Sequence, residues 1–261
     1  MTDTAPYFVD ISVPEKVILG RSEPVLNHPN IWDAVWYRAA PSAMHRDDNG
    51  AVQEWRPDAG VGTVATPSKP NTNHSRCAPD GGLVFQAGIN AGFVIKDGLV
   101  EPPSFSCAIR YRSEDGEARS LITINPNEEN TYLFLTEKDR QIYWQDQQGL
   151  VSLSLPAPQD GWVAAGYSQG KLSLTVAQHG EYFGPILRSD AGADKLRTAL
   201  SGSSDVFIGC RSHRGGIKKT LGSSTIHDIL IWIDRDINTG DRLGLEAVRQ
   251  YCERKTVTDD F

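Results

Sequence analysis

Short runs in which apolar and polar residues alternate recur between residues 82 and 233. The run from Phe105 to Tyr111 is the clearest, because Phe105, Cys107, Ile109 and Tyr111 fall on one face. Alternation with period two, bounded by turn residues, is typical of half-buried β-strands. We therefore predict strands at 83–85, 93–95, 105–111, 120–124, 132–136, 141–145, 150–155, 162–167, 171–178, 206–209 and 224–233. Strands at this spacing indicate an antiparallel sandwich.

The first thirty residues have a different composition. They contain four prolines and only one short β-like run, at 16–19. Proline interrupts both strands and helices. We predict that residues 1–30 form an extended arm, which lies over the domain or docks on a partner.

Two more strands are expected before the main series, at 31–37 and 51–56. Asn49 and Gly50 precede the second of them, and this pair favours a hairpin because both residues tolerate positive φ. Residues 57–80 are rich in Gly, Pro, Thr and Asn, which predicts a long loop.

The end of the chain shows a helical period instead. Leu245, Val248 and Cys252 fall on one helical face, with charged residues outside it. The prediction is an all-β fold, a two-sheet antiparallel jelly-roll sandwich over residues 31–261, with one short C-terminal helix.

Several motifs suggest a family. Residues 34–37, 48–55 and 82–85 resemble the opening of laminin-G-like, or concanavalin A-like, jelly rolls of phage and bacterial surface proteins. Residues 162–174 resemble their central "W-x-x-V-A … G-x-L-x-L" hairpin, and residues 205–232 resemble their closing strands. The resemblance implies two antiparallel sheets, one of them concave, with ligands on the concave face or in the rim loops. Many such relatives bind glycans and others bind proteins, so the fold does not fix the function.

Charge narrows the classes of partner. The 261 residues carry a formal net charge of −7, which argues against binding a nucleic-acid backbone or anionic lipid. No apolar run is long enough to cross a membrane. The N-terminal sequence lacks the features of a secretory signal. We expect synthesis in the cytoplasm and action outside the cell on a released phage-like particle.

Catalytic and metal motifs are weak. Jelly-roll glucanases carry E-x-D-x-x-E on one strand, which points two carboxylates into one cleft, and this chain lacks that spacing. Residues 114–117 are interpreted as a solvated hairpin tip. We therefore expect no enzymatic activity and no required cofactor. Calcium at the oxygen-rich loops 46–49 or 125–130 is left open. The cysteines match no metal or redox motif, and we expect buried thiols at Cys77, Cys107, Cys210 and Cys252.

Carbohydrate binding needs exposed aromatic rings and planar polar groups. Adjacent strand residues point to opposite faces, so one of Tyr143 and Trp144 should face away from the core. The loop 210–219 is the densest cationic segment and follows a predicted sandwich strand. The candidate carbohydrate-binding residues are Tyr143, Trp144, Arg211, His213 and Arg214, whereas Trp36, Trp55, Trp162 and Trp232 are assigned to the core.

Three hypotheses follow. The first is a non-catalytic carbohydrate-binding protein that attaches a particle to a host cell-surface polysaccharide, with the arm bound to a particle or capsid protein. In type, this arrangement resembles head-fibre or spike proteins of tailed phages and gene transfer agents. The second is a structural or protein-binding sandwich without glycan binding. The third is a polysaccharide lyase or hydrolase.

Overall fold

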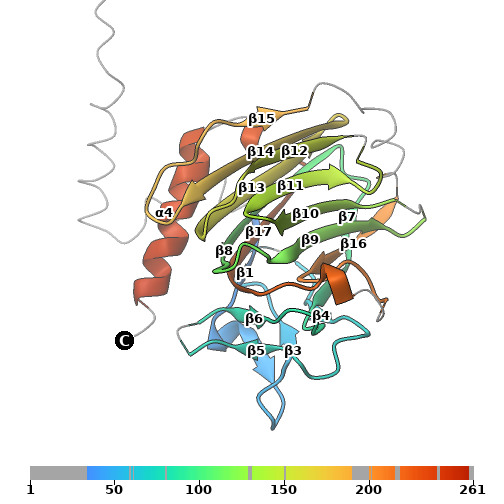
Figure 1. Cartoon of the computed structure of the whole chain (residues 1–261), viewed down its shortest axis with the longest axis vertical. Helices are drawn as coiled ribbons and strands as arrows, with labels where there is room; N and C mark the ends of the chain where they lie inside the picture. The colour runs from blue at the N-terminus through green and yellow to red at the C-terminus, as the bar shows by residue number, and fades with distance from the viewer. Residues whose placement is uncertain are drawn as a thin grey trace, which may run out of the picture.

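The computed structural model describes residues 34–258, apart from 59, 61, 80, 129–130, 150, 190–199, 201, 215–217 and 240–241. The strands in this part of the chain form two large antiparallel sheets (Figure 1), which confirms the predicted jelly-roll sandwich. The arm predicted over residues 1–30 lies outside the described residues.

One sheet has eight strands. Their order is β15 (Leu187–Arg188), β14 (Lys171–Gln178), β13 (Asp160–Ser168), β8 (Ser104–Arg112), β17 (Ser224–Ile233), β6 (Leu83–Phe85) and β5 (Arg76–Cys77), with β1 (Ala34–Arg38) also paired to β17.

The other sheet has seven strands. Their order is β12 (Ser152–Pro156), β11 (Gln141–Asp146), β10 (Leu133–Lys138), β9 (Arg119–Pro126), β16 (Ser203–Ile208), β7 (Phe93–Val100) and β4 (Thr66–Pro67). The short strands β4 and β5 interrupt the segment predicted as one long loop. A strand of two residues carries no alternation that could be recognised in the sequence.

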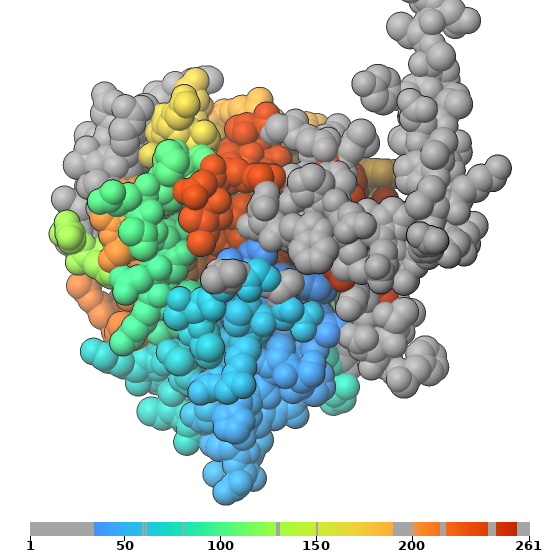
Figure 2. Space-filling view, turned by 180° about the vertical axis from the view of Figure 1, so that it is seen from behind, coloured from blue at the N-terminus to red at the C-terminus, as the bar shows by residue number. Residues whose placement is uncertain are grey.

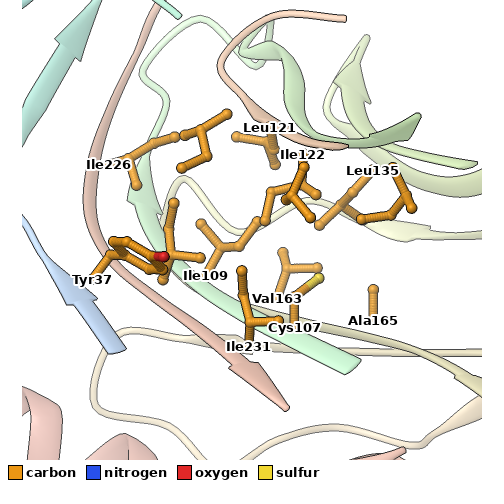
Figure 3. Close-up of a cluster of buried hydrophobic side chains, with 14 of the residues drawn as sticks. Tyr37, Cys107, Ile109, Leu121, Ile122, Leu135, Val163, Ala165, Ile226 and Ile231 are labelled. Carbon is orange, nitrogen blue, oxygen red and sulfur yellow. The ribbon is translucent and has the colours of Figure 1, made fainter. Parts of the chain in front are cut away.

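The main core lies between the two sheets. Figure 3 shows Ile109, Val163 and Ile231 of the eight-stranded sheet facing Ile122 and Leu135 of the seven-stranded sheet. This layer consists of the apolar residues that alternate along each strand, whose burial is the main favourable contribution to folding. The four tryptophans assigned to the core are all buried, which confirms that prediction: Trp36, Trp55, Trp162 and Trp232.

A bulge in β9 changes which residues face outward. Leu135 pairs with Ile122, but the next residue, Thr136, pairs with Ser120, so Leu121 is the extra residue. Leu121 and Ile122 both belong to the buried core. A bulge breaks strict alternation at one point, and here it places the polar Ser120 in line with Thr136.

The C-terminal helix α4 (Arg242–Thr258) covers the outer face of the eight-stranded sheet (Figure 1). Leu245, Val248 and Cys252 pack there against Trp162 and Trp232. The predicted helical face is therefore confirmed. No helix in the described part of the chain is long and apolar enough to span a membrane.

A separate hairpin joins β2 (Met44–Arg46) to β3 (Val52–Trp55) and projects from the lower end of the molecule (Figures 1 and 2). Gly50 has a φ of 76°, as the predicted Asn-Gly turn requires. The Oδ1 atom of Asp47 accepts hydrogen bonds from the amides of Asn49 and Ala51, at 2.9 and 2.8 Å.

Candidate functional site

The outer face of the seven-stranded sheet is the face turned away from the core. The register aligns two rows of side chains across this face. One row contains Phe207, Thr123, Phe134, Gln145 and Ser152, and the other contains Ser120, Thr136, Tyr143 and Ser154. These two rows of side chains are part of the described surface of the outer face.

The segment between β16 and β17 folds back over part of the outer face. Cys210 and Leu221 from this segment form a small buried cluster with Val94 and Phe207. Near its end lies the short helix η2 (Lys218–Thr220), which is beside β9 in Figure 1. The Ser120 hydroxyl donates to the Thr220 carbonyl at 2.9 Å. These contacts hold both ends of the segment against the sheet.

A cavity of about 230 Å³ lies between this segment and the outer face. We call it the outer-face pocket. It is open to solvent on one side. Strands β9, β10 and β11 and the segment between β16 and β17 contribute residues to it. Its lining comprises Arg119, Thr136, Glu137, Lys138, Tyr143, Gln145, Arg211, Lys219 and Thr220.

Tyr143 and Trp144 divide as alternation predicted. Tyr143 is half-buried and lies between Thr136 and Ser154 on the outer face, so part of its ring is open to the pocket. Trp144 is 0% exposed, and its Nε1 donates to the Gly166 carbonyl across the core at 2.9 Å. Because Trp144 has no surface to offer a ligand, it is a core residue and not part of the site as the sequence had suggested.

Arg211 is the cation that the structure brings to Tyr143. Its guanidinium carbon lies 4.4 Å from the centre of the Phe134 ring, a cation–π contact. Burial lowers the pKa of this guanidinium from its ordinary value, yet an arginine side chain stays protonated in proteins. The side chain is thus held in one place by the aromatic ring beneath it.

His213 and Arg214 lie outside the pocket lining, unlike the prediction that grouped them with Arg211. The His213 ring packs edge-on against Phe207 at 5.0 Å, and its Nδ1 accepts a hydrogen bond from the Lys69 amide at 3.2 Å. Partial burial, with Lys69 nearby, lowers the pKa of His213. Both facts favour the neutral imidazole. Arg214 is exposed.

Arg119, Thr136 and Gln145 also line the pocket, and they were not singled out from the sequence. Their only sequence signal is position in a strand. Gln145 is two residues from Tyr143 and therefore shares its face, whereas the placement of Thr136 and Arg119 depends on the register of β9, β10 and β11.

Glu137 is the one carboxylate among the lining residues, and it points away from the pocket. Its Oε2 accepts a hydrogen bond from the Ala118 amide at 3.0 Å. Its carboxyl group lies beside Tyr111 in β8 of the eight-stranded sheet and beside Ser113, which directly follows β8. Burial raises the pKa of this carboxyl, while the hydrogen bonds from Ser113 and Ala118 oppose that shift. The acid is directed into the sandwich.

Metal-ligand residues do not gather in the described part of the chain, where no group of three or more His, Cys, Asp or Glu side chains could hold an ion. Two loops were considered for calcium. In loop 46–49, Asp47 already uses one carboxylate oxygen to accept hydrogen bonds within its own turn. The other loop includes residues 129–130, which are outside the described residues. Calcium binding stays a prediction. The cysteines are free thiols. Cys107, Cys210 and Cys252 are buried as predicted, whereas Cys77 is partly exposed, unlike the prediction.

No protein-family model matches the chain, and no curated protein sequence matches it. Solved structures do. An arabinofuranosidase in complex with arabinofuranosyl-α-1,2-xylobiose matches 76% of this chain and 51% of its own, with a TM-score of 0.52 and 9% identity. A mutant GH54 α-L-arabinofuranosidase soaked with 4-nitrophenyl α-L-arabinofuranoside matches 77% and 50%, with a TM-score of 0.51 and 9% identity.

Domains LG4-5 of the mouse laminin α1 chain match 67% of this chain and 45% of their own, with a TM-score of 0.41 and 14% identity. This chain spans about half the length of the arabinofuranosidases that it matches. At these identities the likeness shows the fold alone. That fold is a two-sheet antiparallel jelly-roll sandwich.

The expectation that the chain has no enzymatic activity was wrong, because enzymes are found among the solved structures that share this fold. It depended on one missing feature, the paired carboxylates of jelly-roll glucanases. Arabinofuranosidases share the architecture, so the missing spacing does not exclude hydrolysis of a glycosidic bond.

Proposed function

We propose that this protein binds carbohydrate in the outer-face pocket, with Tyr143 as the ring against which a sugar lies. The observation that carries the proposal is the meeting of an outward-facing tyrosine with a fixed guanidinium in one open cavity. Sugar rings present C–H faces that pack on aromatic rings, while their hydroxyls need hydrogen-bond donors and acceptors.

The pocket supplies both kinds of contact. Thr136 and Gln145 flank Tyr143 with a hydroxyl and an amide, each able to donate and accept. Few charged residues are needed for such recognition, because planar polar groups fix the orientation of a ligand that buries its apolar face. The volume of about 230 Å³ suits one or two sugar residues, with a longer chain extending into solvent.

The narrower role that we propose is attachment of a phage-like particle to a host cell-surface polysaccharide outside the cell. The support for it is the resemblance to jelly rolls of phage and bacterial surface proteins at residues 34–37, 48–55, 82–85, 162–174 and 205–232. In this proposal residues 1–30 dock on a particle or capsid protein. Removal of these residues should abolish incorporation into particles and leave sugar binding by the remaining chain unchanged.

The test of sugar binding uses an array of bacterial capsule and lipopolysaccharide fragments, followed by calorimetry with the best binder. Tyr143→Ala should weaken binding at least tenfold, because the stacking surface is removed. Tyr182→Ala is the matched control: Tyr182 is 72% exposed and precedes Phe183, which packs on the outer face of the other sheet. This control should bind as the unsubstituted protein does.

Equal binding by both tyrosine variants would overturn the assignment of the pocket. No binding to any fragment on the array would favour a structural or protein-binding sandwich. The bound fragments should also be incubated with the protein and checked for shortened chains, since cleavage would show that the sandwich acts as a hydrolase or lyase.

A further inference from the structure

Arg211 has no acidic partner among the described residues, whereas Arg38 and Arg249 each have one. Arg38 lies 3.4 Å from Asp58, and Arg249 lies 2.8 Å from Glu246. Arg211 instead contacts the Phe134 ring, and its Nε is buried with no hydrogen-bond partner in the part of the chain that the structure describes.

A buried donor without a partner is costly, because it has lost water and gained no acceptor in return. A guanidinium carries five N–H donors in one plane. The Phe134 ring covers one face of that plane and makes no hydrogen bonds to its edge. The donors at the edge are therefore available to an acceptor that enters the pocket.

The charges around the pocket favour a negative acceptor. Lys219, Lys138 and Arg119 line it together with Arg211. Two of these have acidic neighbours, since Arg119 pairs with Glu117 at 2.5 Å and Lys138 lies 3.5 Å from Asp139. No ion pair is recorded for Lys219 or Arg211 among the described residues. The pocket is thus locally cationic on a chain whose net charge is −7.

We infer that the outer-face pocket selects a sugar residue that bears a carboxylate, with the carboxylate on the Arg211 guanidinium and the sugar ring against Tyr143. This inference depends on the proposed function and names its ligand class. A planar carboxylate matches the two parallel N–H groups of a guanidinium edge. Uronic acids and other acidic sugars of surface polysaccharides present that group.

The deciding experiment compares one oligosaccharide in two forms by calorimetry: an oligogalacturonate, and the same chain after its carboxyl groups are reduced to alcohols. We expect the reduced chain to bind about 10- to 100-fold more weakly. Arg211→Lys should weaken binding of the acidic chain by a similar factor, because lysine keeps the charge and loses the two-point geometry.

Arg214→Lys is the matched control, because Arg214 lies on the same loop, is exposed and does not line the pocket. Binding by this variant should be unchanged. Thermal denaturation of each variant will show whether the loop remains folded. A sulfated oligosaccharide provides a third arm, and it should bind more weakly than the carboxylate chain and be affected less by Arg211→Lys.

The outcomes separate this inference from the proposed function. Equal binding of the acidic and reduced chains, both lost in Tyr143→Ala, would overturn carboxylate selection and leave carbohydrate binding in place. Preference for the sulfated chain would replace carboxylate with sulfate as the ligand group and so overturn the inference. If neither chain binds and the array is also empty, both proposals fail.

Discussion

Two adjacent aromatic residues in β11 should respond to substitution in opposite ways. Trp144 is fully buried, stands edge-on to Phe105 at 6.3 Å and donates to the Gly166 carbonyl. Tyr143, one residue earlier, lies on the outer face. We predict that Trp144→Phe destabilises the fold and that Tyr143→Phe does so far less.

The expected cost for Trp144 has two parts. Loss of the indole N–H removes one buried hydrogen bond to the Gly166 carbonyl, which costs about 0.5–1.5 kcal/mol. The smaller phenyl ring also leaves a void, which adds about 1 kcal/mol or more where the surroundings cannot close it. The total is about 1.5–3 kcal/mol, or about 3–12 °C in Tm for a domain of this size.

Urea denaturation, monitored by far-UV circular dichroism, measures this difference in the free energy of unfolding. Tyr143→Phe should shift the free energy of unfolding by less than about 1 kcal/mol, as surface substitutions usually do. If Trp144→Phe is as stable as the unsubstituted protein, the reasoning that places its indole in a closed, hydrogen-bonded core position is refuted. A large loss of unfolding free energy in Tyr143→Phe would equally refute the outward placement of Tyr143.

Three further predictions concern the eight-stranded sheet and the thiols. Burial raises the pKa of Asp228 to about 6, so the folded state keeps a proton that the unfolded chain releases near its ordinary pKa. From pH 4 to pH 6.5 the free energy of unfolding should therefore fall by up to about 3 kcal/mol more in this protein than in Asp228→Asn. Parallel curves of unfolding free energy against pH for the two proteins would contradict this. A Cβ added at Gly166 would lie 2.0 Å from the Asp236 Oδ1, so Gly166→Ala should cost about 1–3 kcal/mol or more in urea denaturation, with no loss arguing against this packing. Burial raises the pKa of Cys107 and Cys210 to about 12, so a thiol reagent at pH 8 should label them only on unfolding, and fast labelling of the folded protein would show that they are accessible.

The sequence predicted the architecture because each main strand carries its own periodic signal. Alternation along 105–111 gives β8, and the helical period of Leu245, Val248 and Cys252 gives the buried face of α4. These signals are local, since a strand with one buried face must alternate wherever it lies in the sheet. The short strands β4 and β5 were missed because pairing with a neighbour, and not their own residues, makes them strands.

The candidate site divides in the same way. Alternation alone implied that one of Tyr143 and Trp144 faces outward, and it could not say which. The sequence also showed that Arg211 belongs to a cationic loop. It could not show that this loop turns back onto the sheet, because Arg211 meets Phe134 only through a contact between residues 77 positions apart.

Composition and period thus determined the sandwich, its C-terminal helix and the residue types available for binding. Tertiary structure alone decided that Trp144 is a core residue, that His213 and Arg214 lie outside the pocket, and that Tyr143 and Arg211 share it. The physical reason is that a site is made by strand register and by a long connection between sheets. Both depend on contacts between distant parts of the chain, which no local pattern records.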